Sequence, residues 1–152
     1  MDDAQKLLIE RACQRLVFEF ALHADRGDYD KLGRLFAADG RFTRRGETFR
    51  GHAAIADSVD QLLQNWRSAP KRPTWRVRHF CSNVLIDVRS AESALGSAYY
   101  TIYRYQGGPV DGVPPITGPA LIGDYADEFT LTPDGWRFAS REVQPAFFNP
   151  GA

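Results

Sequence analysis

Apolar residues near the start of the chain recur every three or four positions, which is the spacing of one helix face. From Asp2 to Asp25 these positions are separated by lysine, arginine and glutamate, so we expect an amphipathic helix of about six turns. Gly27 suits the left-handed end of that helix, and Asp28 can cap a second helix through residues 29–36. The pattern therefore predicts two helices that meet at a tight corner.

A short extended pattern follows the second predicted helix. The pair Asp39-Gly40 begins a segment through Phe42, and Gly46 suggests a turn before Thr48 to Arg50, so we expect a small hairpin. Gly51 then opens a third amphipathic helix, which the prolines at positions 70 and 73 end.

The second half of the chain consists of long extended runs rich in β-branched and aromatic residues. Turn residues separate the runs, so consecutive strands should pair antiparallel. Helices followed by such strands indicate an α+β fold, a cone-shaped barrel in which three N-terminal helices pack in a strongly curved, mostly antiparallel sheet. We expect one domain over residues 1–152. The predicted strands are Trp75–Val88, Ala94–Tyr105, Gly118–Leu131 and Trp136–Phe148.

The composition fits one globular domain. The chain has 152 residues, of which 43% are hydrophobic, and 19 basic residues balance 19 acidic ones. A domain of this size buries roughly 70% of its unfolded surface, so it requires neither disulfides nor a structural metal. The start of the chain carries no apolar secretory segment, so we expect Cys13 and Cys81 to be free thiols in a reducing cytoplasm.

Charge and motifs exclude several classes of function. A net charge of zero argues against nucleic acid binding, and no stretch approaches the length of a membrane span. The sequence has no glycine-rich nucleotide motif, zinc-protease motif, serine-hydrolase elbow or CxxC pair, and its three histidines are scattered. We therefore expect no metal and no cofactor.

Asp25 and His79 are the first candidates for chemistry. Asp25 lies at the end of a predicted helix, where the helix dipole disfavours a carboxylate, so it either holds a basic partner at a pocket mouth or begins a surface corner. Strand alternation places His79 on one face with Val77, Cys81 and Asn83. A lone histidine there is either a hydrogen-bonded core residue or a base, and an aspartate partner would favour the base.

The last two predicted strands add two further candidates. Alternation places Tyr125 and Asp127 on one face, so Tyr125 either supplies a proton to a pocket or is an aromatic wall residue. In the last strand it places Phe138 on one face and Arg141 and Val143 on the other. Arg141 either lines the pocket or pairs with Asp127.

Six segments of the sequence together resemble the SnoaL-like branch of the nuclear transport factor 2-like superfamily. The resemblance spans nearly the whole chain and implies that superfamily's fold, whose members range from dehydratases and cyclases to noncatalytic subunits. The matching segments are Ala24–Leu32, Leu35–Gly40, Phe49–Ile55, Arg78–Asn83, Gly123–Phe129 and Gly135–Arg141.

Within this family, Asp25 and His79 resemble the Asp-His dyad of scytalone dehydratase, hexachlorocyclohexane dehydrochlorinase and bile-acid dehydratase. The resemblance implies a general base at His79, an arginine at Arg141 that assists a departing anion, and a pocket residue at Tyr125. The chain departs from these enzymes at Phe20, where they carry a tyrosine or lysine, and at Arg104, where scytalone dehydratase has its second histidine. The substrate is therefore expected to differ from scytalone.

The pocket should be mostly apolar. The leading hypothesis is therefore a cofactor-free lyase that acts on a small hydrophobic, ring-containing molecule. Alternatives are a cyclase or isomerase that uses the same base, a ligand-binding module, and a noncatalytic structural subunit. Family resemblance also implies a homo-oligomer, a dimer or a trimer. The residues expected to line the pocket beside the dyad are Phe20, Phe42, Val77, Leu121 and Tyr125.

Overall fold

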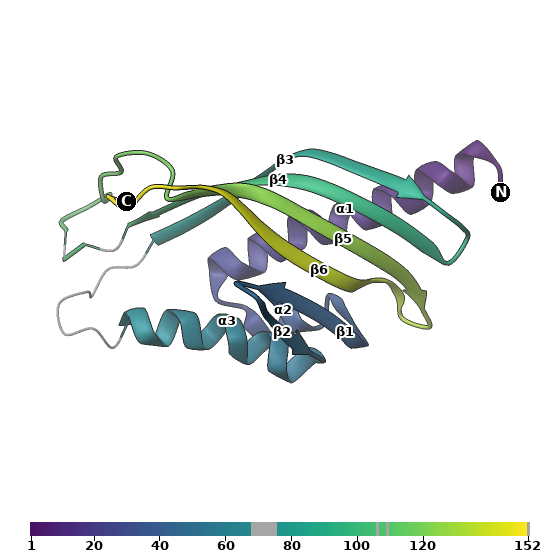
Figure 1. Ribbon diagram of the computed structural model, residues 1–152, viewed down its shortest axis with the longest axis horizontal. Coiled ribbons are helices and arrows are strands. Elements are labelled where there is room, and N and C mark those ends of the chain that lie inside the picture. Colours follow the sequence, from purple (N-terminus) through teal and green to yellow (C-terminus); the bar gives the residue numbers. More distant parts are fainter. Residues whose placement is uncertain (68–75, 106, 109, 152) are drawn as a thin grey trace.

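The computed structural model describes residues 1–67, 76–105, 107–108 and 110–151, with the backbone alone for residues 62–67 (Figure 1). Its helices are α1 (Asp3–Arg26), α2 (Tyr29–Gly33) and α3 (His52–Arg67). A capping box between Asp2 and Gln5 starts α1, and Gly27, at φ +75°, ends it in the left-handed conformation that the sequence predicted.

Six strands form one curled, open sheet in the order β2-β1-β6-β5-β4-β3. Neighbouring strands are antiparallel except for β1 and β6, which run parallel. The α+β class and the curved, mostly antiparallel sheet that the sequence predicted are thereby confirmed. The strands are β1 (Phe36–Arg44), β2 (Glu47–Arg50), β3 (Arg76–Val88), β4 (Ser93–Tyr105), β5 (Leu121–Thr132) and β6 (Gly135–Phe148).

The element boundaries agree with the sequence prediction except in three places. The first extended segment was expected from Asp39 through Phe42, whereas β1 runs from Phe36 to Arg44. The second helix was expected to continue through Phe36, but α2 ends at Gly33, because Phe36 pairs with Phe138 of β6 and so belongs to the sheet. The third long strand was expected from Gly118, whereas β5 begins at Leu121. Trp75 and the predicted end of the third helix beyond residue 67 lie outside the described residues.

The helices fill the concave side of the sheet. Figure 1 shows α1 running along the sheet, with α2 and α3 beside β1 and β2. α1 packs against β3, and α2 packs against α3. The core between these layers is aromatic: the ring of Phe20 in α1 lies within 5.6 to 6.3 Å of the rings of Phe36, Phe42, Tyr125 and Phe138. The C-terminal half of α1 is therefore packed against three strands, β1, β5 and β6.

β-Bulges overturn two of the predicted strand faces. Asn83 adopts φ +52° at a register shift in β3, so it is exposed and does not share the face of His79 as alternation predicted. In β6, Phe138 pairs with Phe129 and Ser140 with Glu128, which leaves Ala139 as an extra residue. Strict alternation fails beyond such a residue.

The bulge in β6 turns the side chain of Arg141 to the same side of the sheet as Phe138, which contradicts the prediction that they lie on opposite faces. The guanidinium carbon of Arg141 lies 4.3 Å from the Phe138 ring centre, and both residues are fully buried.

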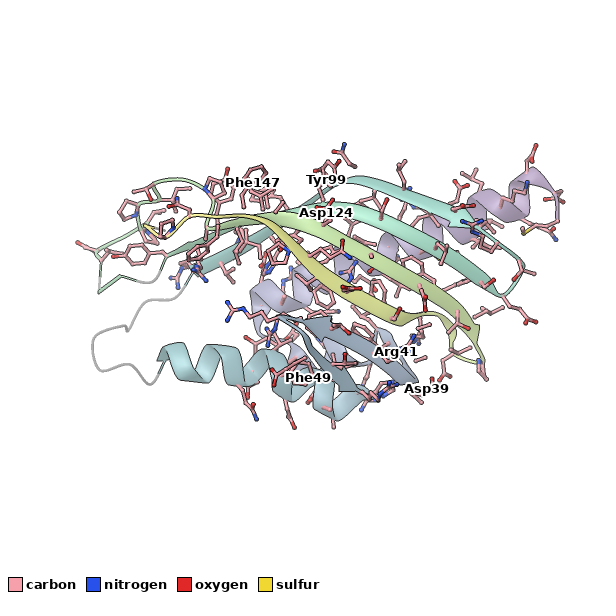
Figure 2. All side chains as sticks on the ribbon, in the orientation of Figure 1. Asp39, Arg41, Phe49, Tyr99, Asp124 and Phe147 are labelled. Atoms are coloured by element: carbon pink, nitrogen blue, oxygen red, sulfur yellow. The ribbon has the colours of Figure 1, made fainter. Side chains whose placement is uncertain are left out.

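The convex face of the sheet carries exposed aromatic residues. Figure 2 shows Tyr99, Asp124 and Phe147 on the side of the sheet away from the helices, and more than half of each of the Tyr99 and Phe147 side chains is accessible.

Cys13 and Cys81 form no disulfide. No helix in the described part of the chain is long and apolar enough to cross a membrane.

Candidate functional site

A cavity of about 200 Å³ lies on the concave side of the sheet, lined from α1, α3, β1 and strands β3 to β6. Its walls are mostly aliphatic and aromatic, as is usual for sites that bind small molecules. The five residues that the sequence suggested for an apolar pocket, Phe20, Phe42, Val77, Leu121 and Tyr125, all line it. The other apolar lining residues are Ala24, Val59, Tyr100, Ile102, Val143 and Pro145.

His79 reaches this cavity from β3, and Asp25 holds it from the last turn of α1. Nδ1 of His79 lies 2.6 Å from Oδ1 of Asp25, and the backbone N–H of His79 donates to both carboxylate oxygens at 3.1 Å. The side chains are 15% and 11% exposed. The backbone donor explains how a carboxylate is tolerated at the negative end of a helix dipole.

This contact assigns the imidazole tautomer. A carboxylate only accepts hydrogen bonds, so the ring proton of a neutral His79 resides on Nδ1 and the lone pair on Nε2. No described residue forms a hydrogen bond with Nε2. The arrangement can therefore accept a proton from a molecule in the cavity, and Asp25 would stabilise the resulting imidazolium.

Two tyrosines form the wall contributed by β4 and β5. Their rings are 4.7 Å apart between centres, and both Tyr100 and Tyr125 are almost completely buried. Burial raises the pKa of each phenol, so both stay protonated at neutral pH and can donate hydrogen bonds. The Tyr100 hydroxyl has no hydrogen-bond partner among the described residues.

Tyr100 was not among the candidates drawn from the sequence, although a signal was present. Alternation in the second long strand places Tyr100 on the same face as Ala98 and Ile102. In the structure, Ala98 and Tyr100 are both buried. Its partner across the sheet is Gly123, where a Cβ atom would lie 2.5 Å from the Tyr100 hydroxyl. The glycine therefore leaves room for the ring.

Arg141 lies behind the cavity wall. Its Nε and Nη2 donate to the two carboxylate oxygens of Asp127 at 2.8 and 2.7 Å, and the side chains are 0% and 1% exposed. Its guanidinium carbon is 4.0 Å from the ring centre of Tyr125 and 4.5 Å from that of Phe20. Burial alone would lower the pKa of Arg141, but the charge and hydrogen bonds of Asp127 outweigh burial and raise it. Of the two roles considered from the sequence, the pair with Asp127 is the one observed.

Three arginines also line the cavity, two of which sequence reasoning missed. Arg44 is the last residue of β1, Arg45 begins the turn to β2, and Arg104 lies in β4. Arg44 donates to the backbone carbonyl of Ser58 at 3.0 Å. The sequence placed a turn near this point, but only the parallel pairing of β1 with β6 brings that turn to the cavity.

The cavity therefore offers a ligand one imidazole, two phenols and three guanidinium groups in an apolar surrounding. The described residues contain no cluster of three or more His, Cys, Asp and Glu side chains that could hold a metal ion. The chemistry that these groups support is proton abstraction, hydrogen-bond donation and stabilisation of negative charge.

Comparison with known proteins identifies the fold independently. No curated protein matches the chain in sequence. Among solved structures, a hexachlorocyclohexane dehydrochlorinase, LinA type 2, matches with a TM-score of 0.77 at 17% identity, covering 99% of this chain and 94% of that one. A protein from Novosphingobium aromaticivorans provisionally assigned as a scytalone dehydratase matches with a TM-score of 0.74 at 19% identity, covering 97% and 91%.

A second protein from Novosphingobium aromaticivorans, described as NTF2-like with a cystatin-like fold, matches with a TM-score of 0.73 at 25% identity, covering 97% of this chain and 88% of that one. Identities this low establish a common fold and leave the reaction to be argued from the site. The model of the SnoaL-like domain matches residues 5–142, so the chain belongs to the SnoaL-like family, within the NTF2-like fold.

Proposed function

We propose that the protein is a cofactor-free lyase that removes a proton and a leaving group from adjacent carbons of a small hydrophobic, ring-containing molecule. The observation that carries this proposal is the 2.6 Å hydrogen bond between Asp25 and His79 at the wall of an apolar cavity. The cavity, at about 200 Å³, is slightly larger than a cavity of about 150 Å³ that binds benzene. A substrate with a single ring fits it.

The reaction begins at Nε2 of His79. Its lone pair takes a proton from a carbon made acidic by a neighbouring carbonyl, and the electrons of the broken C–H bond form an enolate. The enolate then collapses to the conjugated double bond as the leaving group departs, with its electron pair, from the next carbon. Asp25 stabilises the imidazolium through Nδ1. The apolar walls keep water away from the ion pair, which strengthens this interaction.

Tyr125 is proposed to stabilise the leaving oxygen or halide. Burial raises the pKa of its phenol and the charge of Arg141 offsets part of that rise, so the phenol stabilises the leaving group as a hydrogen-bond donor. Arg141 does not line the cavity, so we propose that it acts through Tyr125 and Phe20 as a positioning residue. Tyr100 is a second donor on the same wall.

The test is an elimination assay in D₂O with cyclic ketones that carry a hydroxyl or chloride on the β carbon. Conjugated enone formation is followed by absorbance, and deuterium incorporation by mass spectrometry. We expect His79→Gln to lower both rates about 100-fold or more, as for loss of a general base. The control is His23→Gln, a histidine of α1 that does not line the cavity.

Enone formation and deuterium incorporation together distinguish the alternative functions that the sequence left open. Deuterium incorporation without elimination would indicate the cyclase or isomerase alternative, since those reactions share the first step. Equal rates for the wild type and His79→Gln across the panel would contradict the role of His79 as a base and favour a binding or structural role.

We also propose that two or three copies of the chain assemble through the convex face of the sheet. Phe80, Tyr99 and Phe147 expose aromatic surface there, and apolar patches of this kind often mark protein interfaces. Light scattering after size exclusion measures the oligomeric state directly. If the Phe147→Asp variant forms an oligomer of the same size as the wild type, this surface is not the interface.

A further inference from the structure

The charge on the cavity wall is unbalanced. The described lining residues include the neighbouring pair Arg44 and Arg45 but neither aspartate nor glutamate. Asp25, which is not itself a lining residue, is bonded to His79. A cleft with low-dielectric walls and charge of one sign concentrates ligands of the opposite sign.

Arg44 is held in place at this wall. Its Nη2 donates to the Ser58 carbonyl, and its guanidinium lies 5.9 Å from the ring centre of Phe42. No described carboxylate lies within ion-pair distance of it. Burial, together with the charge of Arg45, lowers the pKa of Arg44, and Glu47 offsets part of this effect. The site therefore carries two neighbouring positive charges that an anion would balance.

Arg45 occupies a position that is unfavourable for arginine. It forms with Gly46 the two-residue turn between β1 and β2, at φ +53° and +81°. Turns with two positive φ values favour Asn, Asp or Gly at the first position, because these residues tolerate the left-handed conformation. Arg45 is exposed and yet lines the cavity, which places the mouth beside it. A strained residue at a ligand site points to function.

We propose that the cavity binds a single-ring molecule carrying an oxyanion, either a carboxylate or a phosphate group, with the oxyanion at Arg44 and Arg45 and the ring against Phe20 and Tyr125. This inference rests on the proposed function insofar as it names the substrate class of the same site. A guanidinium group can donate two parallel hydrogen bonds to the oxygen pair of a carboxylate or a phosphate. A neutral group of the same shape cannot replace this charged interaction.

Isothermal titration with benzoate, phenyl phosphate and neutral benzamide tests the proposal without requiring turnover. We expect at least one of the two anions to bind about 10-fold or more tightly than benzamide, and its affinity to fall with added salt. The anion that binds more tightly identifies the oxyanion. Equal affinity for benzamide and both anions would overturn the proposal.

Arginine variants localise the contact. We expect Arg44→Gln and Arg45→Gln each to weaken binding of the preferred anion about 10-fold and to leave benzamide binding nearly unchanged. The control is Arg50→Gln, an exposed arginine of β2 that does not line the cavity. Because Arg44→Gln also removes a hydrogen bond to Ser58, Arg45→Gln is the decisive variant. If Arg45→Gln binds the anions as the wild type does, the site is wrong.

The failure of this proposal is distinguishable from failure of the lyase proposal. Arginine-dependent anion binding without deuterium exchange on any ketone would retain the oxyanion site and contradict the lyase. Exchange that depends on His79, combined with equal binding of benzoate, phenyl phosphate and benzamide, would retain the base and overturn the oxyanion site.

Discussion

Asp25 of α1 binds His79 of β3 at two points, the ring Nδ1 and the backbone N–H, across 54 residues of sequence. The carboxylate thus joins the end of a helix to a strand and also fixes the ring that faces the cavity. Asp25→Asn keeps one oxygen for the backbone but allows the imidazole to adopt either tautomer.

For Asp25→Asn we expect the deuterium exchange rate to fall by about 100-fold or more, with a loss of about 1 to 2 kcal/mol in the free energy of unfolding. Exchange assays and urea unfolding measure the two effects. The matched control is Asp28→Asn, two residues after the helix end and outside the cavity. An exchange rate within a few-fold of the wild type would exclude a role for the carboxylate in catalysis.

Asp127 and Arg141 form an ion pair that is almost fully shielded from solvent, and breaking it from one side leaves a charge without its partner. We expect Asp127→Asn to lower the free energy of unfolding by about 3 to 5 kcal/mol. The double variant Asp127→Leu, Arg141→Met removes both charges and should recover much of that loss. Urea denaturation of the three proteins tests this, and a double variant less stable than the single one would argue against it.

Strand faces were predictable from the sequence only where no bulge intervenes. On β5, Tyr125 and Asp127 are buried on one face, as alternation predicted, together with Gly123 and Phe129. On β3 and β6 the prediction fails after the extra residues, because one inserted residue reverses the inward and outward positions. Asn83 marks its bulge by a positive φ that asparagine tolerates well, whereas nothing in the sequence around Ala139 marks the second bulge.

Contacts between elements far apart in the chain could not be predicted from local sequence patterns. Alternation placed His79 on its strand face but could not show that the end of α1 lies beside it; only the family resemblance paired it with Asp25. The parallel pairing of β1 with β6, which brings Arg44 and Arg45 to the cavity, joins segments about 100 residues apart. Such a pairing leaves no periodic signal in either segment.

Removal of the buried Tyr100 hydroxyl should affect stability and activity differently. It has no hydrogen-bond partner among the described residues, so its removal in Tyr100→Phe eliminates an unsatisfied polar group. We expect the free energy of unfolding to stay the same or rise by up to about 1 kcal/mol. If the hydroxyl donates to the substrate, elimination should slow about 10-fold or more. A fall in stability above about 1 kcal/mol would instead show that the folded protein pairs this group.

Alkaline pH should destabilise the fold through buried acids, of which Cys13 is the clearest. Burial, with a smaller contribution from the charge of Asp127, raises the pKa of the Cys13 thiol to about 12. In the unfolded chain a thiol loses its proton near pH 8.5, so between that pH and about 12 base favours the unfolded state. The stabilising contribution of the protonated thiol is therefore complete below about pH 8 and is lost as the pH rises.

We expect the free energy of unfolding to fall from about pH 9 upward by about 1.4 kcal/mol per pH unit for each such group, with Tyr125 contributing at higher pH because burial also raises its pKa. Cys13→Ala removes one of these groups, so its stability should decline less steeply, although the variant is less stable at neutral pH. Urea unfolding at several pH values measures both slopes. Identical slopes for Cys13→Ala and the wild type would show that the thiol keeps an ordinary pKa in the folded protein.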